Sequence, residues 1–282
     1  LFKIIILSSF LFSATSQQLL DKGIFKLYNY ELDEAVSLLD SAYTINSHHP
    51  VIPFVSIAAK WLYTQTINGY EKSYSVLYDN VNKTIPIYEN LINTYPDDPE
   101  YLLYLGSTYG IQARVALATK NWIQVIYSGY KGYSFTHKAH QINPDLKDAF
   151  MPIGLMEFYS CMASPPVKIA AKVLGIAPDC EKGILHLQYA VNGGGYSRIE
   201  ASNALTYIYL YFLNDPNTAL KYITPISDEH PENPFFAALK GEALARSGNF
   251  IDLDKFYPHL ELLSQNGPFL QRNETELKIK YI

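Results

Sequence analysis

GIFKLYNYELDEAVSLLDSA, residues 23–42, is the stretch of sequence that decides the fold. Gly23, Ala35, Leu39 and Ala42 lie at offsets of 0, 12, 16 and 19 residues along it. Two antiparallel helices approach closely only where small side chains permit it, and a larger apolar residue then fills the space one turn away. The stretch therefore predicts a pair of closely packed helices.

The same offsets return near the end of the chain, at Gly241, Leu253, Tyr257 and Leu260. Pro234 is suited to the first position of the helix that precedes them, and Gly248-Asn249 is typical of a turn. Other helix ends are expected between these two units. Proline cannot continue a helix interior, so each proline-bearing stretch indicates a unit boundary. These stretches are 95–99, 143–145 and 230–234.

We therefore expect an all-α protein in which antiparallel helical pairs stack as a right-handed α-solenoid. Asn68-Gly69 is interpreted as a turn between helices rather than a β-hairpin. About six pairs are predicted, several of them longer than a repeat of about 34 residues. Their ranges are 17–49, 51–96, 98–145, 147–195, 198–231 and 233–266.

These offsets resemble the packing positions of tetratricopeptide repeats (TPR), and the resemblance covers most of residues 17–266. The central region is also similar to the inclusion-body-clearance group of TPR-related proteins. The order of motifs that carries this second similarity is Asn121-Trp122, Gly129-Tyr130-Lys131-Gly132, Pro165-Pro166 and a Leu174-Gly175-Ile176 corner, which lacks that group's aromatic residue. Both resemblances imply a helical repeat protein that binds partners, and neither implies an enzyme activity.

The first 16 residues are predicted to be a signal peptide. Lys3 precedes an apolar run over residues 4–12, and Ala14 and Ser16 place small residues before a cut at Gln17. This order is typical of secretory signals, so we expect an exported protein, periplasmic or secreted. A buried N-terminal helix is the alternative. Cys161 and Cys180 either form a disulfide in the exported protein or remain two separate thiols.

Composition and motifs exclude several classes of function. The net charge is −5, which disfavours a nucleic-acid binder. The sequence contains no nucleophile elbow, phosphate-binding loop or His-Glu-x-x-His pair. His137 and His140 share a helix face, but no third metal ligand accompanies them. We therefore predict no catalytic residue, no metal site, no cofactor and no enzyme activity.

A protein or peptide is the predicted partner, bound in the concave groove that the first helices of the pairs line. The repeat offsets place eight residues in this groove: Met151, Phe158, Tyr159, Tyr211, Phe212, Phe235, Glu242 and Arg246. The alternative function is a glycan-handling accessory protein of the bacterial cell envelope, because aromatic faces stack on sugars. Residues 165–176 form a short cationic amphipathic stretch, which either crosses the repeat stack as a helix or makes a peripheral membrane contact.

Overall fold

The computed structural model describes the backbone of residues 2–266 and the side chains from Thr15 to Gln265, except at positions 70, 71, 166 and 170. Helices account for all the regular structure of these residues. In chain order they are α1 (Phe2–Tyr28), α2 (Leu32–Ile45), α3 (Ile52–Thr94), α4 (Pro99–Ala118), α5 (Trp122–Ile142), η1 (Lys147–Ala149), α6 (Phe150–Met162), α7 (Pro165–Val173), α8 (Cys180–Asn192), α9 (Arg198–Tyr207), η2 (Ile208–Phe212), α10 (Pro216–Glu229), α11 (Pro234–Arg246) and α12 (Phe250–Asn266).

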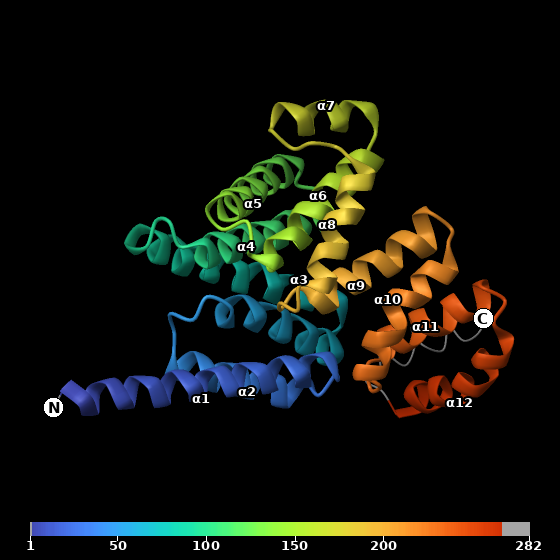
Figure 1. Cartoon of the computed structure of the whole chain (residues 1–282), viewed down its shortest axis with the longest axis horizontal. Coiled ribbons are helices and arrows are strands. Elements are labelled where there is room, and N and C mark those ends of the chain that lie inside the picture. The colour runs from blue at the N-terminus through green and yellow to red at the C-terminus, as the bar shows by residue number, and fades with distance from the viewer. Residues whose placement is uncertain (1, 267–282) are drawn as a thin grey trace.

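Apart from α7, which lies beside α6, helices that follow one another in sequence pack against one another from α1 to α12, which makes the protein an α-solenoid (Figure 1). Over the described residues the pairs are α1–α2, the two halves of α3, α4–α5, α6–α8, α9–α10 and α11–α12. Gly69 has φ of +79° and breaks α3 between residues 68 and 70, at the dipeptide that we expect to form a turn. Helix α7 is inserted between the two members of the fourth pair.

The first pair packs through the small residues of the 23–42 stretch. A methyl group on Gly23 would lie only 2.9 Å from Cγ of Leu39, so α1 and α2 meet at this glycine. Ala35, Leu39 and Ala42 are all fully buried. The predicted contact is confirmed, and so is the expectation of an all-α fold built from paired helices.

The central pairs cross even more closely, at glycines contributed by both helices. A methyl group on Gly154 of α6 would lie 2.7 Å from the carbonyl oxygen of Gly183 on α8. In the same way, one on Gly106 of α4 would lie 2.7 Å from the carbonyl oxygen of Gly132 on α5. Backbone therefore packs directly on backbone at these crossings, and any side chain would force the helices apart.

Side-chain caps define where several helices begin. Asp98, Asp179, Asp215 and Asn233 each accept at least one backbone N–H bond from the first turn of α4, α8, α10 and α11, respectively. Such caps satisfy donors that have no partner within the helix. Proline at the first position strengthens the start of α4, α10 and α11, because its ring already has the helical φ.

The stack bends back on itself, so that the end of α1 touches the start of α11 (Figure 1). The rings of Tyr28 and Phe236 stack with centroids 6.2 Å apart, and Asn233 donates from Nδ2 to the Tyr28 carbonyl at 2.8 Å. His230 is buried beside them, and burial lowers its pKa. The first and last pairs therefore brace each other.

A disulfide joins Cys161 at the end of α6 to Cys180 at the start of α8. The bond closes the segment that carries α7. Of the two possibilities that the sequence left open, a disulfide or two separate thiols, the structure has the disulfide. The apolar residues at the start of the chain are part of α1. Over the described residues, no helix combines the length and apolar character needed to cross a bilayer.

Candidate functional site

Four exposed aromatic rings gather where α6 meets η2. They are Tyr159, Tyr207, Tyr211 and Phe212, each between 37% and 46% exposed, and together they are called the aromatic surface below. Large rings in contact with solvent are unusual enough to indicate a binding surface when they lie together.

The local structure of η2 explains why these rings face outward. Residues 208–212 form a π-helix, in which one extra residue is accommodated in a turn. Ile208 and Leu210 are fully buried and anchor it to the core. Tyr207 and Tyr211 are four positions apart and lie side by side, with ring centroids 5.4 Å apart.

Phe158 supports the aromatic surface from below. It is fully buried, and the Phe212 ring stands edge-on to it with centroids 5.5 Å apart. Phe212 is also edge-on to Tyr159, at 5.9 Å. Edge-to-face pairs of this kind are stabilising beyond their buried area. The rings of Phe212 and Tyr159 are therefore held in place by the buried Phe158.

A polar network fixes the other side of the surface. The Tyr211 hydroxyl donates to Oε2 of Glu242 at 2.6 Å, and Arg246 donates from Nη1 to Oε1 of the same carboxylate at 3.2 Å. Nη2 of Arg246 donates to the Leu210 carbonyl at 2.6 Å and to Oδ1 of Asn214 at 2.9 Å. The Arg246 guanidinium also lies over the Tyr211 ring.

These contacts determine the ionisation state of Tyr211. Burial, followed by the hydrogen bond to Glu242, raises the pKa of Tyr211 well above its usual value. The hydroxyl therefore stays neutral and remains a donor at physiological pH. The network positions an aromatic ring and a charged edge, an arrangement that suits recognition rather than proton transfer at neutral pH.

Five of the eight residues expected in the groove form two adjoining contacts. Tyr159 packs on Phe212, and Tyr211, the residue before Phe212, binds Glu242, which also pairs with Arg246. Phe158 does not face solvent and acts as their support. Met151 is partly buried against α8 and α9. Phe235 lies elsewhere, against Tyr30 at the contact between α1 and α11, with ring centroids 5.7 Å apart. Tyr207 belongs to the surface but was not among the expected residues.

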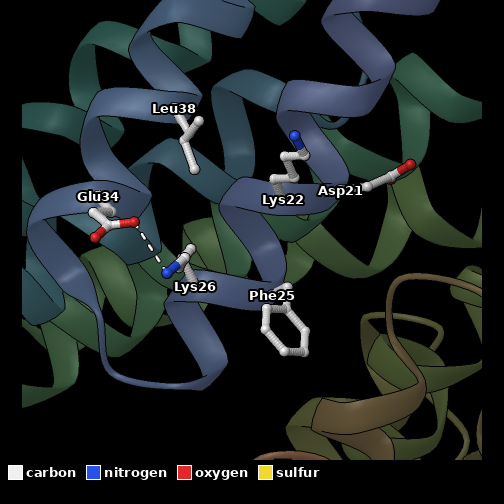
Figure 2. A pocket seen from close by; sticks show the side chains of 6 residues that line it. All are labelled: Asp21, Lys22, Phe25, Lys26, Glu34 and Leu38. Atoms are coloured by element: carbon white, nitrogen blue, oxygen red, sulfur yellow. Dashed lines mark ion pairs between the residues drawn. The ribbon is translucent and has the colours of Figure 1, made fainter.

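A hollow between α1 and α2 is a weaker candidate. It is lined by Asp21, Lys22, Phe25, Lys26, Glu34 and Leu38 (Figure 2). Lys26 spans it to form ion pairs with Glu31 and Glu34, the latter with Nζ and Oε2 3.0 Å apart. Lys26 and Glu34 are therefore already paired with each other, and no further contact points to a ligand.

The cluster around Glu157 is also a structural feature. This carboxylate is buried, and its two oxygens lie 2.7 Å from Nδ1 of His186 and 3.3 Å from Nζ of Lys182. A buried carboxylate needs such partners. Among the described residues, no group of three or more His, Cys, Asp or Glu side chains is arranged to hold a metal ion.

Among solved structures, this chain is similar to a thermophilic TPR protein of Thermus thermophilus. The similarity has a TM-score of 0.47 at 16% sequence identity, and it covers 82% of this chain and 99% of that one. No protein-family model matches the chain, and no curated protein matches its sequence. The assignment of the fold therefore depends on the helix packing described above.

Proposed function

We propose that this TPR-like α-solenoid is a non-enzymatic scaffold that binds a protein or peptide partner at the aromatic surface. One observation carries the proposal: the four exposed rings of the aromatic surface adjoin a Glu242–Arg246 ion pair, to which the Tyr211 hydroxyl is hydrogen-bonded. Tyrosine and arginine dominate the binding energy of protein interfaces, and rigid side chains lose little entropy on association. Solenoids of helical pairs offer extended surfaces for such partners.

The proposed scaffold works outside the cytoplasm. Two features support export: the signal-like order of residues 1–16, and the Cys161–Cys180 bond. Disulfides persist in oxidising compartments such as the periplasm or the secretory pathway. Sequencing the N-terminus of the protein recovered from the source organism tests this part, because a cut before Gln17 makes Gln17 the first residue of the mature protein.

Affinity capture tests the binding surface. Purified wild-type protein is compared with Tyr159→Ala and Tyr211→Ala, using extract of the source organism. Tyr78→Ala is the matched control, because Tyr78 is a similarly exposed tyrosine on α3, far along the chain from the surface. We expect the wild type and the control to retain the same protein, and both test variants to lose it.

Retention of every partner by both test variants would show that the aromatic surface is not the binding site. A glycan array tests the alternative function, binding of sugars. If wild-type protein binds defined glycans and Tyr211→Ala does not, the surface recognises sugars and the proposal of a protein partner fails. Circular dichroism of each variant establishes that a loss of binding is not a loss of fold.

A further inference from the structure

A second apolar surface covers the first half of α5, and only its edge reaches α4, where the ring of Tyr127 stands edge-on to Tyr109 with centroids 6.4 Å apart. Its members are Trp122, Ile123, Ile126, Tyr127 and Tyr130, all exposed and together called the α5 face below. Ile123 is 84% exposed and Trp122 61%. An isolated exposed apolar residue is ordinary, but five on adjoining turns of one helix form a patch that requires an explanation.

The spacing of these residues places them on one side of the helix. At about 100° per residue, positions 122, 123, 126, 127 and 130 fall within an arc of about 140°. The opposite side of α5 packs on α4 through Gly132, Thr136 and Ala139. Lys131 borders the α5 face, and its ammonium group lies 5.9 Å from the centre of the Tyr127 ring.

The stretch of sequence that contains the α5 face is opposite in net charge to the whole chain. Between Glu100 and Asp145 the sequence has four basic residues, listed by position as 114, 120, 131 and 138, and no acidic residue. The chain as a whole carries a net charge of −5. The acidic residues therefore lie in other segments, and this segment is selectively cationic.

Helix α7 repeats the same composition. It exposes Ile169 and Val173, four positions apart, and carries Lys168 and Lys172 with the same spacing. No acidic residue occurs between Phe158 and Pro178. In Figure 1, α5 and α7 both lie in the upper part of the molecule, whereas α1, α2 and α12 lie in the lower part.

We propose that the α5 face docks on an anionic lipid surface, with α7 as a secondary contact. Tryptophan and tyrosine are favoured at the level of lipid headgroups, and isoleucines beside them insert among the acyl chains. Lysines at the border of the face contact anionic headgroups. A second copy of the chain fits the face less well, because a symmetric pair would bring the same lysines against each other.

The test measures binding of the full chain to vesicles. One set contains zwitterionic lipid alone, and the other includes about one third anionic phosphatidylglycerol. A Trp61→Phe background leaves Trp122 as the single tryptophan, because the chain has only two. Brominated lipids then quench fluorescence at the α5 face and report contact at that site, whatever the rest of the chain does.

Two pairs of variants separate the contribution of apolar insertion from that of the lysine charge. Ile123→Asp is compared with Ile251→Asp, which changes another strongly exposed isoleucine, 73% exposed, on α12. We expect the first to weaken vesicle binding about tenfold or more and the second to leave it unchanged. Lys131→Gln should weaken binding to anionic vesicles about fivefold, whereas Lys221→Gln on α10 should not.

The proposal holds if anionic vesicles bind, Trp122 is quenched, and only the variants of the α5 face lose affinity. It is overturned if vesicles do not bind, if Trp122 stays unquenched, or if Ile123→Asp and Ile251→Asp behave alike. Sedimentation velocity of the same proteins measures whether the chain self-associates. A wild-type dimer that Ile123→Asp dissociates, without vesicle binding, would assign the face to a second copy and also overturn the proposal.

Discussion

Replacing Gly183 by alanine should destabilise the protein, although alanine is the better helix former. The added methyl group would lie 2.7 Å from the backbone nitrogen of Phe158 and 2.8 Å from the carbonyl oxygen of Gly154. Both neighbours are backbone atoms of α6, which cannot rotate away as a flexible side chain does. Helices α6 and α8 would therefore have to separate.

The size of the effect follows from the geometry. Ordinary contact begins at about 3.4 Å, so the helices must move apart by about 0.7 Å at the crossing. Overpacking costs about 1–3 kcal/mol, and about 2–3 kcal/mol applies here because both contacts are with backbone atoms. The higher helix propensity of alanine offsets about 1 kcal/mol of this. We expect a net loss of about 1–2 kcal/mol in the free energy of unfolding.

Gly129→Ala is the matched control, because the same methyl group on α5 meets nothing within 4 Å. It should gain about 0.5–1 kcal/mol from helix propensity alone. Urea unfolding followed by circular dichroism at 222 nm measures both. With an m-value of about 2 kcal/mol/M, the Gly183→Ala midpoint should fall by about 0.5–1 M. A midpoint at or above that of the wild type would refute the close crossing of α6 and α8.

Three further predictions concern stability. Cys161→Ser should lower the free energy of unfolding, measured in urea, by about 3 kcal/mol, because the 19-residue separation to Cys180 is then no longer closed by a bond in the unfolded chain. A reductant should lower the stability of the wild type and leave that of the variant unchanged. The free energy of unfolding should fall as the pH drops below about 6.5, since unfolded His230 takes up a proton there while the buried ring, with its lowered pKa, resists it. His230→Phe should flatten this pH dependence in thermal unfolding, and an unchanged slope would count against the burial of the ring. Asn233→Ala should lower the free energy of unfolding by about 1–2 kcal/mol. Asn233→Asp should lower it less, because aspartate keeps the helix cap and loses only the bond to the Tyr28 carbonyl. Equal losses for the two variants would show that the cap contributes nothing to stability.

The helical-pair fold was predictable because its signal is local. The offsets at Gly23 determine which residues of α1 and α2 can touch, and the structure places Leu39 against that glycine. The bend that brings Tyr28 to Phe236 was not predictable, because those residues are far apart in sequence and no pattern within either helix encodes the contact. It arises from the accumulated rotation of successive pairs.

The candidate site was predictable only in part, because the repeat offsets depend on a regular helical register. Repeat offsets assume regular α-helices, whereas the π-turn at residues 208–212 changes which side chains point outward. Tyr207 lies just before this turn, and its ring contacts that of Tyr211 with centroids 5.4 Å apart, a contact that the offsets did not indicate. Phe158 falls on the inner side because α6 and α8 approach closely at Gly154. The α5 face was missed because a sequence does not show whether a neighbouring unit covers a helix.

Site-specific crosslinking tests the central claim most directly. A photoreactive phenylalanine analogue is placed at Tyr211 and, as a control, at the similarly exposed Tyr78. After irradiation of living source cells, we predict a discrete protein adduct from position 211, absent from position 78 and lost when Tyr159→Ala is added. Identical adducts from both positions, or no protein adduct at position 211, would contradict the assignment of the aromatic surface as a protein-binding site.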